Sequence, residues 1–200
     1  MTAIHGSHIT YYEFLMTTLL LIRHGETDWN VDGRYTGQSD IPLNETGRAQ
    51  ARQAAAQLAD NPPDVVIASD LERARDTAVI IAAPFHLPVH IDPRLREIDQ
   101  GVWEGMYFPD IKAKYAAEFA AREADPLSVA PPGGETVGQV RERVLTAVAD
   151  IRQKYPRQRV AVVAHGLALA LIKAEATNHP IHQVWDLIPP NAQVEEIGLT

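Results

Sequence analysis

Short, mostly apolar runs alternate along this chain with longer segments of helical pattern. Four runs predict strands: 19–22, 65–68, 89–91 and 160–164. Between and after them, apolar residues spaced three or four apart predict helices over 45–59, 73–83, 109–122, 137–155 and 167–176. Apolar strands that alternate with helices are typical of βαβ units, in which a parallel sheet is buried on both faces. We therefore expect an α/β fold with a largely parallel central sheet and helices on both faces.

The chain of 200 residues has the length of one domain. Residues 1–15 lack the alternating pattern and end just before a second methionine, Met16. We expect them to be a non-catalytic extension, and residues 16–200 to form the single domain. The segment 99–135 separates the third predicted strand from the longest predicted helix, and we expect it to form a small helical lid or cap.

The composition excludes several classes of protein. Without cysteine, the chain has no disulfide scaffold, thiolate zinc site, cysteine nucleophile or iron–sulfur cluster. The net charge of −8 argues against nucleic acid as a partner, because nucleic acid needs a basic face. No apolar run approaches the roughly 20 residues that span a membrane, and no signal-peptide pattern opens the chain. We expect a cytoplasmic protein with no membrane partner.

Polar residues follow three of the predicted strands directly. Arg23 and His24 follow the first, Arg73 lies shortly after the second, and His165 follows the last. The carboxyl ends of parallel strands share one edge of the sheet, so these residues should lie together. Two histidines alone are too few for a metal site, and a cation beside two guanidinium groups is electrostatically unfavourable. Arginine forks instead suit a phosphate dianion. We therefore expect a phosphate site with no metal and no cofactor.

Six blocks, in order, resemble the histidine phosphatase superfamily, and together they extend through most of 18–195. They are residues 21–30, 34–44, 69–78, 95–105, 132–136 and 165–166. One such tripeptide would be unspecific, but six in the same order are not. The resemblance implies a phosphoglycerate mutase-like three-layer sandwich with a small helical cap insertion.

The resemblance also implies roles for individual residues. His24 would attack phosphorus and become phosphohistidine, and Glu97 would protonate the leaving oxygen and then deprotonate water. The expected catalytic residues are His24, Glu97, His165, Arg23 and Arg73. The expected substrate-binding residues are Arg23, Asn30, Thr36, Gly37, Gln38, Arg73, His165 and Gly166.

Some neighbouring residues have other expected places. Glu104 is the main rival of Glu97 for the role of acid. Asp70 is expected to orient an arginine of its own block. His182 and Trp185 are expected at the surface rather than at the pocket rim. Many relatives continue further than this chain after residue 194, so a C-terminal closing segment is expected to be short or absent.

The blocks imply a phosphatase of the histidine acid phosphatase type that hydrolyses small phosphate monoesters. The alternative is a phosphoglycerate mutase, which returns the phosphoryl group to another hydroxyl. A regulator that binds phosphorylated partners is a third hypothesis. The predicted lid has few cations to hold a second phosphate, only Lys112, Lys114 and Arg122, which favours the phosphatase. The expected partner is a small-molecule phosphate ester, and a homodimer is left open.

Overall fold

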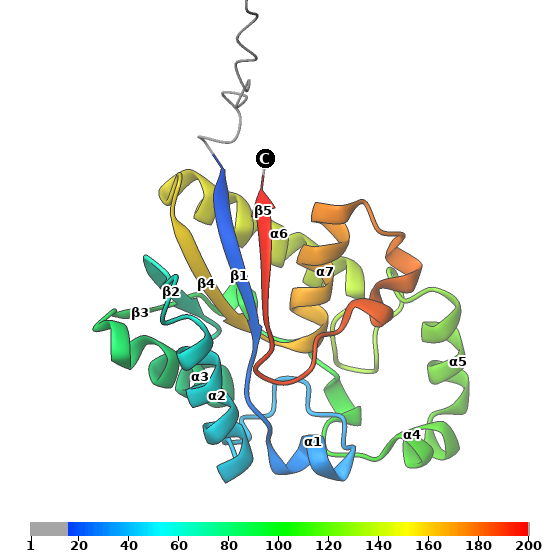
Figure 1. Ribbon diagram of the computed structural model, residues 1–200. Helices are drawn as coiled ribbons and strands as arrows, with labels where there is room; N and C mark the ends of the chain where they lie inside the picture. The colour runs from blue at the N-terminus through cyan, green and yellow to red at the C-terminus, as the bar shows by residue number, and fades with distance from the viewer. Residues whose placement is uncertain (1–15, 200) are drawn as a thin grey trace, which may run out of the picture.

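The computed structural model describes residues 16–199, so the expectation for residues 1–15 lies outside the described residues. A single sheet of five strands has the order β3-β2-β4-β1-β5 (Figure 1). The strands are β1 (Thr17–Arg23), β2 (Val65–Ala68), β3 (Val89–Ile91), β4 (Arg159–Ala164) and β5 (Val194–Leu199). Each neighbouring pair from β3 to β1 is parallel, whereas β5 runs antiparallel to β1. The predicted α/β class and its four strands are confirmed.

The sheet is buried on both faces, as the apolar runs predict. Helices α2 (Glu45–Gln57) and α3 (Glu72–Ala82) cover one face, and α6 (Val137–Lys154) and α7 (Gly166–Thr177) cover the other (Figure 1). In β1, Leu20 and Ile22 pack toward α2 and α3, while Leu19 and Leu21 pack toward α6 and α7. Successive side chains of a strand point to opposite faces, so a continuous apolar run supplies both cores.

The cap differs from its prediction. The expected helix over 109–122 is two helices, α4 (Phe108–Lys114) and α5 (Ala116–Ala124), which meet at Tyr115. The backbone of Tyr115 leaves the helical region, with φ −125° and ψ 41°. The break lets both helices contribute to a separate apolar cluster around Trp103, with Ile111 and Phe119. Packing around a buried indole therefore overrides local helix propensity here.

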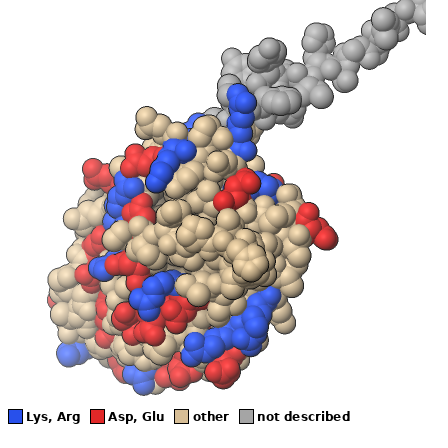
Figure 2. All heavy atoms as spheres, turned by 90° about the vertical axis from the view of Figure 1, so that its left-hand side faces the viewer, with Lys and Arg blue, Asp and Glu red and all other residues tan. Residues whose placement is uncertain are grey.

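The remaining elements are short and lie in the connections. They are α1 (Asp28–Asp32), η2 (Ala83–Phe85), η3 (Pro93–Leu95), η4 (Gly101–Trp103) and η5 (Ile181–Leu187). On the face of the molecule that carries α2, α3 and β3, basic and acidic side chains are interspersed (Figure 2). This face offers no continuous basic surface.

A close approach of two glycines fixes the start of α2 against the loop after β1. A Cβ on Gly47 would lie 2.2 Å from the carbonyl oxygen of Glu26, and one on Gly25 would lie 2.4 Å from that of Gly47. Alanine normally favours a helix over glycine by about 1 kcal/mol. We expect Gly47→Ala to destabilise the protein instead, by about 1–3 kcal/mol, because backbone must move. Denaturant unfolding measures this.

The exposed Gln53 lies on the same helix and provides the control. Gln53→Ala should change the free energy of unfolding by no more than about 0.5 kcal/mol. If Gly47→Ala were as stable as Gln53→Ala, the two backbones would not be in the contact described.

Candidate active site

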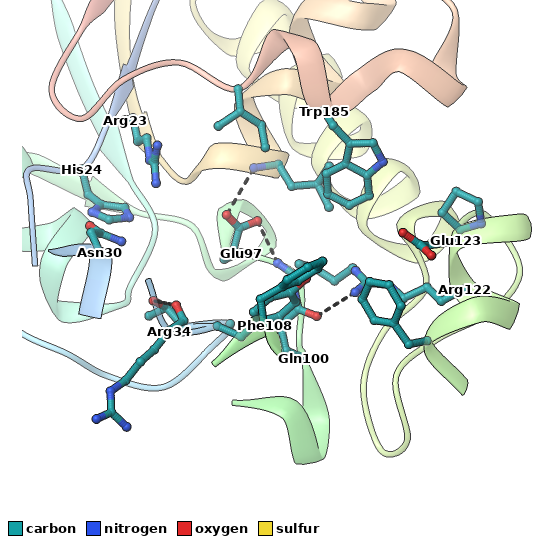
Figure 3. Close-up of a pocket in the computed structure, with 18 of the residues that line it drawn as sticks. Arg23, His24, Asn30, Arg34, Glu97, Gln100, Phe108, Arg122, Glu123 and Trp185 are labelled. Carbon is teal, nitrogen blue, oxygen red and sulfur yellow. Dashed lines mark hydrogen bonds between the residues drawn. The ribbon is translucent and has the colours of Figure 1, made fainter. Parts of the chain in front are cut away.

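The residues that follow β1, β2 and β4 do meet at one edge of the sheet. A cavity of about 740 Å³ opens there, and Arg23, His24, Arg73 and Glu97 lie on its wall. Figure 3 shows three of them, Arg23, His24 and Glu97. His165, the N-cap residue of α7, packs against His24 with 5.2 Å between ring centroids. The expectation that strand order would gather these groups, far apart in sequence, is confirmed.

His24 is buried, with 3% of its surface exposed, and its ring is held in one orientation. Its Nδ1 lies 2.7 Å from the carbonyl oxygen of Gly25. A carbonyl only accepts, so Nδ1 carries the proton and Nε2 keeps its lone pair. Burial lowers the pKa of His24 well below its usual 6.5, and the charges of Arg73 and Arg23 lower it further. The imidazole is therefore neutral at physiological pH and nucleophilic at Nε2.

Arg23 and Arg73 are fixed by backbone carbonyls rather than by carboxylates. Arg23 donates from Nη1 to Pro189 O at 2.9 Å, and Arg73 donates to Ser39 O at 2.8 Å and to Gly37 O at 2.7 Å. Burial lowers the pKa of both, that of Arg73 to about 10, so both stay charged near neutral pH. The Nε atoms of both are buried without a hydrogen-bond partner among the described residues. Neutral partners leave the two positive charges available to an anion.

His165 is fully buried, with its ring beside that of His24 on the cavity wall. Neither ring nitrogen has a hydrogen-bond partner within residues 16–199. Burial, followed by the charge of Arg73, lowers the pKa of His165 well below 6.5. A neutral ring with one N–H and one lone pair free beside His24 is an unusual arrangement, because buried polar groups are normally paired.

Besides Arg23 and Arg73, three of the expected ligands line the cavity: Asn30, Thr36 and Gly37. The side-chain oxygen of Asn30 accepts from Thr27 N at 3.1 Å and from Asn191 Nδ2 at 3.3 Å. Its amide nitrogen is therefore the group left for a ligand.

Gly166 and Gln38 are not on the wall. Gly166 packs closely against Ile188, since a Cβ there would lie 3.1 Å from Ile188 Cγ2. Gln38 donates to the carbonyl oxygen of Glu97 at 3.1 Å and to Glu135 at 3.3 Å. Its side chain thus supports the segment that carries Glu97.

The carboxylate of Glu97 is held by backbone amides. Oε1 accepts from Ile98 N at 3.0 Å, and Oε2 accepts from Leu167 N, in the first turn of α7, at 3.2 Å. Neighbouring Arg94 and Arg96 form their ion pairs elsewhere. Glu97 is therefore not a surface ion-pair residue; it lies on the cavity wall opposite Arg23 and His24 (Figure 3).

Comparison with known proteins identifies the family. The family model of the histidine phosphatase superfamily (branch 1) matches residues 19–200. The chain belongs to the histidine phosphatase superfamily. It is 33% identical to "Phosphoserine phosphatase 1" of Hydrogenobacter thermophilus, covering 92% of this chain and 87% of the relative. It is 34% identical to "Probable phosphoglycerate mutase GpmB" of Enterobacter, covering 91% and 85%. The solved α-ribazole phosphatase of Shigella flexneri has a TM-score of 0.82 at 32% identity, covering 90% and 89%.

Within this histidine phosphatase, Glu104 does not rival Glu97. Its two carboxylate oxygens accept from Gln38 N at 2.7 Å and from Ser39 Oγ at 2.5 Å, and it does not line the cavity. Glu104 therefore fixes the loop that presents Gly37. Asp70 likewise pairs with Arg96, not with an arginine of its own block. The hydrogen bonds of Glu104 and the ion pair of Asp70 join segments that are far apart in the sequence, so the spacing of residues does not predict them.

The C-terminal part contributes to the cavity wall. His182 and Trp185 are exposed, as expected, and they also line the cavity together with Ile188. The segment 181–193 thus forms one side of the site. In the same segment Asn191, which the sequence analysis missed, donates to His24 O at 2.9 Å. Nothing in the local sequence marks Asn191, because its partner lies 167 positions away.

The described residues contain no group of three His, Cys, Asp or Glu side chains placed to hold a metal ion. They also include no helix with the length and apolar character needed to cross a membrane.

Proposed function

We propose that this protein is a phosphomonoesterase of the histidine acid phosphatase type, which hydrolyses small phosphate esters through a phosphohistidine on His24. The observation that carries the proposal is the state of His24: neutral, with Nδ1 bound to Gly25 O and Nε2 unprotonated beside Arg23 and Arg73. A neutral imidazole aimed at a site built for a dianion is suited to attack phosphorus.

In the first step the phosphoryl oxygens bind Arg23, Arg73 and the amide nitrogen of Asn30. His24 Nε2 forms a bond to phosphorus while the bond from phosphorus to the leaving oxygen breaks. Glu97, protonated at the start, gives its proton to that oxygen, so an alcohol leaves. The Nδ1–H bond to Gly25 O stabilises the positive charge that the ring acquires.

In the second step water attacks phosphorus and the N–P bond breaks. Glu97, now a carboxylate, takes the proton of the attacking water and returns to its starting state. Phosphate leaves, and His24 is neutral again. His165 is proposed to donate its ring N–H to a phosphoryl oxygen, which would satisfy one of its two unpaired nitrogens.

A mutase is the second candidate, supported by the similarity to a relative named as a probable phosphoglycerate mutase. A mutase must retain a bisphosphate intermediate while its phosphoryl group moves between hydroxyls. Of the three cap cations, all of them within the described residues, Arg122 lines the cavity, whereas Lys112 lies over the rings of Phe108 and Phe119 and Lys114 over that of Tyr115. This favours hydrolysis. With 3-phosphoglycerate, release of inorganic phosphate rather than of the 2-phospho isomer would distinguish the two.

Turnover is expected to need no metal ion, because arginines supply the positive charge that a cation otherwise gives. Protein freed of metal by exhaustive chelation should hydrolyse p-nitrophenyl phosphate at an unchanged rate. Loss of activity on chelation, restored by one divalent ion, would contradict the proposal.

Acid quenching during turnover of a labelled ester should trap protein-bound phosphate that is stable in base and labile in acid.

A further inference from the structure

A second arginine site lies at the far end of the cavity from His24. Arg122, on α5 of the cap, lines the cavity and is only 7% exposed (Figure 3). Its guanidinium lies over the ring of Trp103, with 5.4 Å from Cζ to the centroid, and over that of Trp185, at 5.8 Å. Nη1 donates to Gln100 Oε1 at 3.1 Å. These contacts fix the direction of the group.

Those contacts involve the two faces of the guanidinium and its Nη1 atom. They leave the edge formed by Nε and Nη2 without a hydrogen bond. Nε and Nη2 of Arg122 are buried and have no hydrogen-bond partner among residues 16–199. These two nitrogens form the edge that binds a carboxylate side-on with two parallel hydrogen bonds. No acidic side chain of the described residues forms an ion pair with Arg122 (pairs are formed by the arginines 34, 48, 75, 94, 96, 141, 143 and 159).

Two other arginines of this chain bind a carboxylate through the edge formed by Nε and Nη2. Arg143 donates from Nε and Nη2 to the two oxygens of Glu135, at 3.0 and 2.9 Å. Arg96 donates from the same two atoms to the two oxygens of Asp70. At Arg122 the corresponding edge is buried at the cavity without a protein carboxylate. A buried, unpaired guanidinium is costly unless a ligand pairs with it.

The surroundings favour a monoanion over a second phosphate. Glu123, next in the chain, also lines the cavity and reduces the positive charge at this end. Lys112 and Lys114 do not line it. One planar fork beside a carboxylate suits another planar, singly charged group, whereas a dianion needs more positive charge.

We propose that Arg122 binds a carboxylate on the leaving group, so that the preferred substrates are phosphate monoesters of hydroxy acids or hydroxy amino acids. The proposal rests on the proposed function, since it needs the phosphoryl group at His24. With the phosphate held at one end of the cavity and the carboxylate at the other, Glu97 lies between them at the leaving oxygen (Figure 3).

Two matched pairs of substrates test this. O-phosphoserine differs from phosphoethanolamine, and 3-phosphoglycerate from glycerol 3-phosphate, by the carboxylate. In the wild type, kcat/KM should be higher for the carboxylate member of each pair. Arg122→Met, which keeps the length but not the charge, should lower it about 10–100-fold for that member, mainly through KM, and change the other member little. Arg122→Lys should keep part of the preference.

Arg52→Gln removes the same charge from an exposed position outside the cavity and is the control for long-range electrostatics. It should leave the preference unchanged. Inhibition of p-nitrophenyl phosphate hydrolysis by each pair gives an independent measure of binding. If Arg122→Met has a clearly lower melting temperature than the wild type, the test uses Arg122→Lys instead, whose preference for the carboxylate substrates should be reduced but still present.

Equal losses within each pair, or no preference in the wild type, would overturn the proposal for Arg122. If p-nitrophenyl phosphate were still hydrolysed through phosphohistidine, the proposed function would stand. If no ester were hydrolysed by the wild type, both would fail.

Discussion

Replacing His24 with alanine is expected to lower kcat/KM by about 10⁴–10⁶-fold, the range found when a nucleophile or its base is removed from an enzyme. The imidazole is buried, neutral and bound through Nδ1, which leaves Nε2 as the atom that attacks phosphorus. The variant should also fail to form the base-stable, acid-labile phosphoenzyme. Steady-state hydrolysis of p-nitrophenyl phosphate and acid-quench trapping measure the two effects.

His90→Ala is the matched control, since His90 is exposed on the edge strand β3, outside the cavity. It removes one imidazole and should keep both the rate and the phosphoenzyme. Activity of His24→Ala within about tenfold of the wild type would show that His24 is not the nucleophile. Replacing a residue that only binds phosphate would lower the affinity for the ester, and the covalent intermediate would still form.

Replacing Glu97 with glutamine should harm esters with poor leaving groups most. An alkyl phosphate releases an oxygen that needs a proton, whereas p-nitrophenolate leaves without one. General acid catalysis contributes about 10²–10⁴-fold, and Glu97→Gln should lose most of this on an alkyl or sugar phosphate. The loss of kcat/KM on p-nitrophenyl phosphate should be clearly smaller. Competitive inhibition by inorganic phosphate checks that the anion site is intact.

The ratio between the two esters makes the test specific. An amide at position 97 also disturbs one of the bonds from Ile98 N and Leu167 N, but that disturbance affects both esters alike. Glu142→Gln, at an exposed position on α6, is the control and should change neither rate. Equal losses on both esters would show that Glu97 positions other groups and does not supply the proton.

Much of the fold and of the candidate site could be predicted from the sequence. The apolar runs at 19–22 and 160–164 are buried on both faces, which requires helices above and below them and a parallel sheet. In such a sheet the residues after each strand share an edge, so His24, Arg73 and His165 had to approach one another. These inferences succeed because hydrophobic periodicity is local and acts over a few residues.

β5 was not predicted, because its residues do not form an apolar run. The strand carries Glu195 and Glu196, whose charges are balanced by ion pairs with residues of other elements. Glu195 pairs with Lys173, and Glu196 pairs with Arg159. The break of the cap at Tyr115 depends in the same way on the apolar cluster around Trp103. Tertiary contacts here override the local pattern.

The partners of Glu104 and the places of His182, Asn191 and Arg122 were decided by the tertiary structure alone. Glu97 accepts a hydrogen bond from a backbone amide 70 positions away, and Asn191 donates one to the carbonyl oxygen of His24, 167 positions away. Such contacts leave no period in the sequence, because each depends on where two remote loops cross. The sequence by itself determined the sheet and the reactive groups at its edge; the folded chain decided which carboxylate faces them and which side chains form the far end of the cavity.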